Sequence, residues 1–221
     1  MNIKNKSVLI ILLIIIFHGI NNYIWLKLNQ GLFFDDQAFH LLGGQRLMEL
    51  LSKPSWQMLD QLMRFSIVSF YPPFFHLCMV IFNILFGKSI MSSVMVNIVF
   101  WGILGFSLYY IGKKLGDKNI GLLSIFIVSM YPYVFGLSRT PLPDFALTAM
   151  VIFSLCCLIY TDNFSNRLPS LSLGLSLGLG MLTKQVFIFF IITPLIFVVA
   201  ELLFSRRMNK LRAVNLFFAL L

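Results

Sequence analysis

The feature that most constrains the fold is a series of long, nearly uncharged apolar runs. They lie at 8–26, 70–86, 91–111, 120–137, 145–160, 171–182 and 186–204. The longer ones approach the roughly 20 residues that a helix needs to cross a hydrocarbon core about 30 Å thick. Inside lipid, every backbone polar group must be bonded within its own segment, so these runs favour helices over open strands. The pattern predicts an all-α integral membrane protein that forms a single membrane domain over residues 1–221.

Composition excludes the soluble classes of protein. Hydrophobic residues make up 59% of the chain and charged residues 11%, whereas a soluble domain carries roughly 25% charged residues. A soluble globule of this size cannot bury so much apolar surface. The net charge of +9 is therefore interpreted as membrane topology, because Lys and Arg accumulate in cytoplasmic loops. No nucleic-acid partner is expected, and the three cysteines, all within apolar runs, are predicted to be buried thiols.

The basic residues indicate which runs cross the membrane. Lys4 and Lys6 precede the first run, and no cleavage site follows it, so an uncleaved anchor with a cytoplasmic N-terminus is predicted. If 70–86 also crossed, the basic clusters of the later loops would face outward. If 70–86 instead lies at the outer interface or dips in and returns, most basic residues fall in short cytoplasmic segments: Lys4, Lys6, Lys113, Lys114, Lys118, Arg167, Arg206, Arg207, Lys210 and Arg212.

The second assignment predicts six transmembrane helices and one large outer loop. The first helix is 8–26, the outer loop is 27–90, and five further helices lie within 91–204. Within the loop, 38–51 and 56–69 mix apolar and charged residues as amphipathic helices on a membrane surface do; packing against a soluble domain is the alternative. Residues 213–221 are interpreted as the start of a further hydrophobic segment, so the architecture is expected to be incomplete.

Three carboxylates are placed on the outer face by this topology. Asp35 and Asp36 follow the first helix, and Asp144 follows the third. Ionisable groups at such positions are costly to hold and are functional candidates. A carboxylate there can take a proton from a hydroxyl or bind a metal ion. The alternative is that each carboxylate only caps the helix that follows it.

Basic and aromatic side chains accompany these carboxylates. Arg139 and Lys184 lie near the outer ends of later helices, where they can bind a phosphate head group or simply snorkel to lipid phosphates. His40 and His76 are on the same side and are minor candidates. The sequence holds no phosphate loop, nucleophile elbow or HExxH motif. No metal or cofactor is therefore indicated, although a divalent cation would suit the carboxylates.

Together these features resemble the GT-C glycosyltransferases, particularly the protein O-mannosyltransferase and aminoarabinose transferase branch (family 39-like). Five segments are similar to that family's motifs and occur in its order: 35–40, 71–89, 110–116, 138–144 and 178–184. The chain departs from the pattern at Asp36, where the family has glutamate, and at Gln185, where it has glycine. The family has more helices than this chain, so the resemblance identifies an N-terminal portion, and the missing helices leave open whether this chain is active alone.

The resemblance implies inverting transfer of a hexosyl or pentosyl group from a polyprenyl-phosphate donor to a lipid, glycan or protein acceptor. It also implies a multi-pass protein of the bacterial plasma membrane with its site on the outer face. Asp35 would be the general base, with Asp36 or Asp144 orienting the acceptor or that base. The substrate-binding residues would be Lys184, Arg139, Arg64, Tyr71 and His76, the first three facing the lipid phosphate.

Two other functions remain open. A transporter or flippase predicts carboxylates near helix centres and inverted repeats, whereas here the acids lie at helix ends and no repeat is evident. The other is a truncated, non-catalytic membrane fragment.

Overall fold

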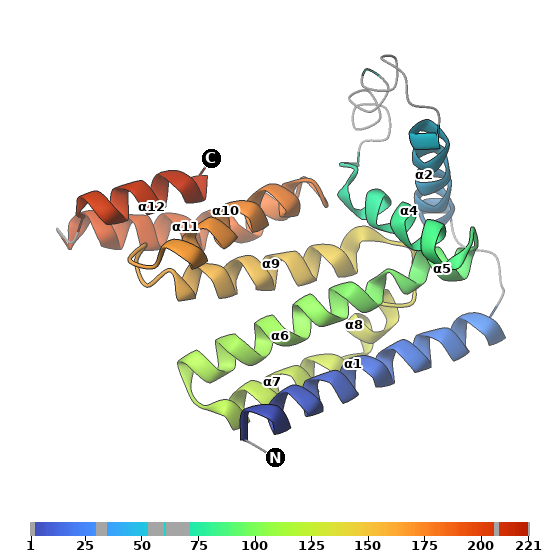
Figure 1. The fold of residues 1–221 in the computed structure, drawn as a ribbon, viewed down its shortest axis with the longest axis horizontal. Coiled ribbons are helices and arrows are strands. Elements are labelled where there is room, and N and C mark those ends of the chain that lie inside the picture. Colours follow the sequence, from blue (N-terminus) through green and yellow to red (C-terminus); the bar gives the residue numbers. More distant parts are fainter. Residues whose placement is uncertain (1–2, 30–34, 53–59, 61–70, 206–207, 221) are drawn as a thin grey trace.

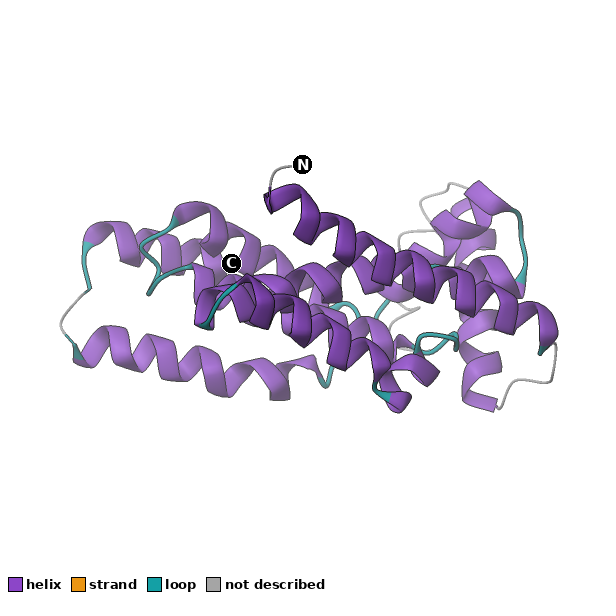
Figure 2. Cartoon of the chain, turned by 90° about the horizontal axis from the view of Figure 1, so that it is seen from below, coloured by secondary structure: helices purple, strands orange, loops and turns teal. Residues whose placement is uncertain are grey.

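The computed structural model describes residues 3–29, 35–52, 60, 71–205 and 208–220 (Figure 1). Every regular element within these residues is a helix, which confirms the predicted all-α class (Figure 2). The helices are α1 (Ile3–Leu28), α2 (Asp35–Ser52), α4 (Phe74–Phe86), α5 (Ile90–Met95), α6 (Asn97–Leu115), α7 (Lys118–Met130), α8 (Pro132–Leu137), α9 (Pro143–Tyr160), α10 (Arg167–Met181), α11 (Phe187–Phe204) and α12 (Lys210–Leu220).

Four helices in the described part of the chain are long and apolar enough to cross a membrane. They cover Lys6–Leu28, Ile90–Leu115, Pro143–Tyr160 and Phe187–Phe204, and the second of these joins α5 and α6. The protein is therefore multi-pass, as predicted.

The other two predicted crossings are shorter than a full span. The run 120–137 is divided into α7, of 13 residues, and the short α8. The break falls at Tyr131 because Pro132, at the first turn of α8, has no amide hydrogen to continue the preceding helix. The run 171–182 lies mostly within α10, which has 15 residues.

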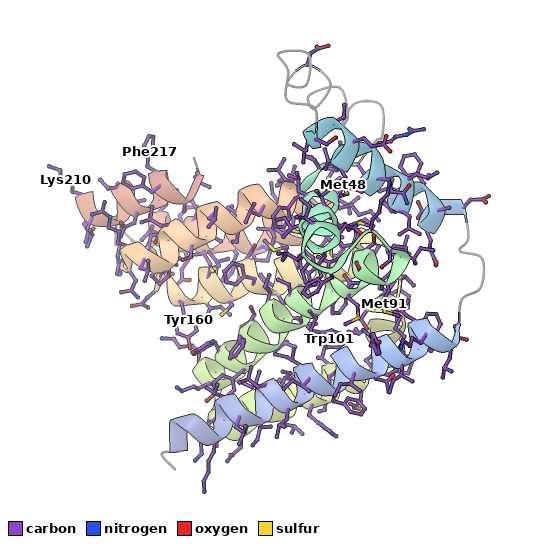
Figure 3. The ribbon with its side chains drawn as sticks, turned by 45° about the vertical axis from the view of Figure 1, so that its right-hand side comes forward. Met48, Met91, Trp101, Tyr160, Lys210 and Phe217 are labelled. Carbon is purple, nitrogen blue, oxygen red and sulfur yellow. The ribbon has the colours of Figure 1, made fainter. Side chains whose placement is uncertain are left out.

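The helices run back and forth between two ends of a bundle (Figure 1). The connections α6–α7, α9–α10 and α11–α12 lie at the end that also holds the N-terminus. This end, called the basic end, carries the described basic residues of those connections and their flanking helix ends: Lys113, Lys114, Lys118, Arg167, Lys210 and Arg212. Figure 3 shows Tyr160 and Lys210 there. The Tyr160 hydroxyl donates to the Tyr110 carbonyl at 3.1 Å, which joins two helix ends.

The opposite end, called the acidic end, holds α2, α4 and α5 together with the first turns of α9 and α11 (Figure 1). The predicted amphipathic helix 38–51 is confirmed as a helix, because α2 covers it. Its buried face meets α4, since a Cβ on Gly44 would lie 3.5 Å from the Met79 Cε. The second predicted amphipathic helix, 56–69, falls almost entirely outside the described residues.

α4 begins and ends at the acidic end. The Phe74 amide donates to the Leu182 carbonyl at 2.9 Å, which ties the start of α4 to the end of α10. Near its other end, the Asn83 side-chain nitrogen donates to the Ser93 hydroxyl at 2.9 Å, and the Asn83 side-chain oxygen accepts from the Ser89 backbone amide at 3.1 Å. A helix of 13 residues is about 20 Å long, too short for the hydrocarbon core. This placement agrees with a segment that folds back instead of crossing.

The largest hydrophobic cluster lies where α6 meets α1, α4 and α9. Trp101, Phe100, Phe75 and Phe145 are fully buried there, and Figure 3 shows Trp101 between α6 and α1. This packing holds the start of α9, and therefore Asp144, beside α4.

Small residues allow α10 to approach its neighbours closely. A Cβ on Gly174 would lie 2.7 Å from the Phe218 carbonyl oxygen of α12. Ser176 accepts a hydrogen bond from the Ser154 hydroxyl of α9 at 2.9 Å. Both contacts require a side chain no larger than the one present.

Replacing Gly174 with alanine is expected to destabilise the protein by about 1–3 kcal/mol, because the backbone of α12 must move away from the new methyl group. Gly178→Ala is the matched control: it lies one turn further along α10, and a Cβ there would meet nothing within 4 Å. Thermal unfolding in detergent measures both. Equal melting temperatures for the two variants would contradict the close contact between α10 and α12.

Candidate active site at the acidic end

Polar side chains from separate segments of the chain converge at the acidic end. They come from α2, from the residues around the start of α4, from the first turn of α9 and from the turn between α10 and α11. We call this group the acidic-end cluster, and it consists of Asp36, His40, Tyr71, His76, Asp144 and Lys184. A set drawn from segments so far apart in sequence can meet only in the folded bundle.

The cluster is continuous from Asp144 to Tyr71. The Lys184 Nζ lies 2.9 Å from the Asp144 Oδ1 and 5.8 Å from the centre of the Tyr71 ring. The Tyr71 ring meets the His40 ring edge-on, with centroids 4.5 Å apart. The aromatic ring therefore lies between the ammonium group and the first histidine.

The histidines extend the cluster to α2. The His40 Nδ1 lies 3.1 Å from the His76 Nε2, within hydrogen-bonding distance. The His40 Nε2 lies 3.6 Å from the Asp36 Oδ1, one helical turn earlier. This contact is longer than a normal hydrogen bond.

Asp144 lies in the first turn of α9, which begins at Pro143, a residue well suited to a helix start. The residue before the helix is Leu142, and α9 has no side-chain cap hydrogen bond. The Asp144 carboxylate instead bonds Lys184. Of the two alternatives for this residue, a cap and a site residue, the geometry favours the second.

Lys184 is held in position by its backbone. Its amide donates to the Gly180 carbonyl at 3.2 Å, and its carbonyl accepts from the Phe187 amide at 3.0 Å. The side chains of Lys184 and Asp144 are 23% and 32% exposed. Both charged groups are therefore partly accessible, so a ligand can reach them.

His40 and His76 are fully buried. The pKa of His40 is lowered to about 4, mainly by burial and also by the nearby Lys184 cation, against the opposing effect of Asp144. Burial likewise lowers the pKa of His76 to about 4, aided by His40 and opposed by a hydrogen bond to the Pro72 backbone. Both rings are therefore neutral at pH 7.

His40 is only a minor candidate in the sequence, although its spacing places it beside Asp36, because residues i and i+4 share one face of a helix and Asp36 precedes His40 by four. The contact with His76 has no such local signal, since 36 residues separate the two rings.

The remaining predicted residues are placed as follows. Asp35 is exposed in the first turn of α2, beside Asp36. Arg139 contacts α1: its Nε donates to the Asn22 Oδ1 at 3.1 Å, its Nη2 donates to Asn21, and its guanidinium lies 3.8 Å from the centre of the Phe135 ring. Arg64 lies outside the described residues.

Within the described segments, no group of three or more His, Cys, Asp or Glu side chains is arranged to hold a metal ion. The chemistry of the cluster is that of carboxylates, an ammonium group and neutral imidazoles. Such a set can accept a proton from a hydroxyl and bind a phosphate oxygen.

A known protein family matches the part of the chain that carries most of this cluster. The family model for dolichyl-phosphate-mannose-protein mannosyltransferases matches residues 71–221. The match contains Tyr71, His76, Asp144 and Lys184 of the cluster, while α2 precedes it. No curated protein and no solved structure matches the chain. Because the family model covers well over half of the sequence, the chain belongs to the dolichyl-phosphate-mannose-protein mannosyltransferase family, of the GT-C glycosyltransferase type.

Proposed function

We propose that this membrane glycosyltransferase moves a sugar from a polyprenyl-phosphate donor to an acceptor hydroxyl at the acidic end of the bundle, with inversion. The observation that carries the proposal is the convergence of Asp36, Asp144 and Lys184 at the end opposite the basic loops. Carboxylates beside a lysine match the two charges of the reaction: a proton leaves the acceptor, and negative charge develops on the departing phosphate.

Asp35 is the proposed general base. The acceptor oxygen attacks the anomeric carbon as the bond from that carbon to the phosphate oxygen breaks, and the acceptor proton passes to a carboxylate. Asp35 is exposed at the start of α2, where an incoming hydroxyl can reach it. Asp36 and Asp144 then orient the acceptor or the base.

Lys184 is the proposed partner of the lipid phosphate. Its Nζ already bonds one anionic oxygen, that of Asp144, and a phosphate oxygen can replace or join this partner. A fixed cation acts most strongly on charge that develops in the transition state. Arg64 and Arg139 are proposed as further phosphate partners. Tyr71 and His76 are proposed to line the substrate site, with the Tyr71 ring below the ammonium group.

The proposed orientation has the basic end in the cytoplasm and the acidic end outside, and the family points to a membrane such as the bacterial plasma membrane. Its support is the gathering of Lys113, Lys114 and Lys118 at one end with the N-terminus, as cytoplasmic loops require.

The orientation is tested with single cysteines at two exposed lysines, Lys88 at the acidic end and Lys118 at the basic end. In a background that lacks the native cysteines, Lys88→Cys is expected to react with an impermeant maleimide on intact cells. Lys118→Cys is expected to react only after permeabilisation. The reverse pattern would overturn the orientation, and labelling of both sites on intact cells would show that the bundle does not separate two compartments.

Donor cleavage separates the proposed function from its alternatives. A transferase releases polyprenyl phosphate in amounts equal to the sugar transferred, whereas a flippase moves the donor intact and a non-catalytic fragment does neither. Thin-layer analysis of a labelled polyprenyl-phosphate sugar, incubated with membranes that contain the protein, distinguishes the three.

A further inference from the structure

A groove lies between α6 and α9, two helices that run side by side through the bundle (Figure 1). Its volume is about 410 Å³, within the range of small-molecule sites. Its exposed lining is entirely apolar and includes no member of the acidic-end cluster. The walls of the groove contain Val99, Ile103, Phe106 and Tyr110 of α6, and Phe153 and Cys156 of α9.

Gly102 keeps this groove open. It lies near the middle of the membrane-spanning segment Ile90–Leu115, and a Cβ on it would meet nothing within 4 Å. A Cβ on Gly105, one turn later, would lie 2.5 Å from the Ile125 Cδ1. Gly105 therefore allows two helices to pack closely, whereas the space beside Gly102 is left unfilled by the described side chains.

The walls of the groove suit a hydrocarbon chain. The hydroxyl of Ser107, which lines the groove, donates to the Ile103 carbonyl at 2.6 Å within α6. Its hydrogen is thus already bonded inside the helix. Val99 and Tyr110, at the two ends of the α6 wall, are exposed, so a lipid chain can enter the groove from the side.

Two tyrosines mark the end of the groove at the basic end of the bundle. The Tyr160 hydroxyl donates to the Tyr110 carbonyl at 3.1 Å, and the two rings meet edge-on with centroids 6.2 Å apart. Tyr160 is the last residue of the membrane-spanning segment Pro143–Tyr160, and Figure 3 shows it at the end of α9. Tyrosines are typical of the membrane–water interface, so the groove ends at the level of the lipid head groups.

Two lysines continue the α6 wall beyond Tyr110. Lys113 and Lys114 follow it by three and four residues, the spacing of neighbours on one face of a helix, and both are exposed. The Lys114 Nζ lies 5.6 Å from the centre of the Tyr160 ring. Asp117, the acidic residue closest to them in sequence, caps α7, where its carboxylate accepts from two backbone amides. Two positive charges therefore lie at the interfacial end of an apolar groove.

We propose that this groove binds an anionic phospholipid of the leaflet at the basic end, with an acyl chain between α6 and α9 and its phosphate at Lys113 and Lys114. Basic groups between membrane helices recognise anionic head groups in this way. From Val99 to Tyr110 the groove follows about 16 Å of helix, close to one leaflet's share of the hydrocarbon core, about 15 Å. The site is distinct from that of the sugar donor, whose proposed phosphate partner, Lys184, lies at the opposite end.

The lysines supply the selectivity of the site, and the groove supplies its position. A chain that enters the groove leaves other hydrocarbon, so it gains little hydrophobic free energy. Each lysine near the surface, in contrast, strengthens the binding of an anionic lipid by about 5-fold. The groove holds the chain and thereby keeps the head group beside the two ammonium groups.

The position of the lipid is tested by photo-crosslinking in vesicles of phosphatidylcholine that contain a minor fraction of phosphatidylglycerol with a diazirine in its acyl chain. Mass spectrometry of the peptides is expected to find the label concentrated in 99–110 and 153–156. Phosphatidylcholine with the same diazirine is the control and is expected to label these segments at least about 5-fold less, the effect of one lysine. Equal labelling by the two lipids would overturn the proposal. So would an absence of label from these segments, the result if another helix or a second copy of the chain filled the groove.

The head-group contact is tested with Lys114→Gln, which is expected to reduce labelling by phosphatidylglycerol by about 5-fold. Lys210→Gln is the matched control, because Lys210 is an exposed lysine at the same end but on α12, and it is expected to keep the wild-type labelling. Equal losses in the two variants would show that the lysines act only through general surface charge, and would overturn the site.

The chain contact is tested with Gly102→Leu, which places a side chain in the groove and is expected to remove the label from 99–110. Gly178→Leu is the matched control, since a Cβ there also meets nothing within 4 Å, and it is expected to keep the label. Wild-type labelling of a folded Gly102→Leu protein would overturn the proposal, and the Lys114 result decides it if that variant does not fold. All of these measurements are independent of sugar transfer.

Discussion

Replacing Asp35 with asparagine is expected to lower the rate of sugar transfer by about 10²–10⁴-fold, the usual contribution of a general base. The amide has nearly the shape of the carboxylate but cannot accept the proton of the acceptor hydroxyl. Asp35 is exposed in the first turn of α2. The change is therefore expected to leave the fold intact, apart from a small loss of favourable charge at the helix start.

Three variants on one helix make this prediction specific. Glu49→Gln, at an exposed site near the other end of α2, is the matched control and is expected to transfer sugar at the wild-type rate. Asp36→Asn is expected to fall between the two, because Asp36 orients the site and faces the His40 ring. Initial rates at matched membrane expression decide the order. Wild-type activity in Asp35→Asn would show that another group is the base.

Replacing Lys184 with glutamine is expected to lower the rate of transfer by about 10²–10³-fold, since removal of one group that stabilises developing charge commonly has an effect of this size. The loss is expected mainly in the chemical step, because the negative charge on the phosphate grows as the glycosidic bond breaks. Asp144 then loses its only charged partner among the described side chains. Lys184→Arg, which keeps the charge, is expected to recover part of the rate.

Lys88→Gln is the matched control for Lys184. Lys88 is an exposed lysine at the same end of the bundle, so its removal changes the general surface charge equally without touching the cluster. Equal rates of transfer for Lys88→Gln and Lys184→Gln would mean that Lys184 acts only through the general surface charge. A selective loss in Lys184→Gln, with donor binding weakened less than turnover, is the expected result.

Local pattern in the sequence was sufficient for the longest helices. The apolar runs predict α1, α6, α9 and α11 because each is long and uncharged, and the mixed segment at 38–51 predicts α2. The Tyr71-Pro72-Pro73 segment marks the start of α4 for a local reason too, because prolines restrict the residues before them. The gathering of basic residues at one end follows from the positions of the loops alone.

The tertiary contacts between helices could not be predicted from local sequence pattern. Nothing local to Arg139 shows that its guanidinium bonds Asn21 and Asn22, because that contact depends on how the turn before α9 packs against α1. The pairing of His40 with His76 likewise depends on α2 lying against α4. Pro132 indicates the division of 120–137 into α7 and α8, whereas the apolar character of the whole run does not.

The central claim is that Asp35 and the adjoining acidic-end cluster transfer a sugar from a polyprenyl-phosphate donor. The measurement that tests it most directly is the conversion of such a donor, labelled in its sugar, by vesicles that contain the wild-type protein, Asp35→Asn or Lys184→Gln at equal amounts. The account predicts that wild type yields labelled acceptor together with an equal amount of polyprenyl phosphate, and that both variants lose nearly all of this conversion. Undiminished conversion by both variants would contradict it.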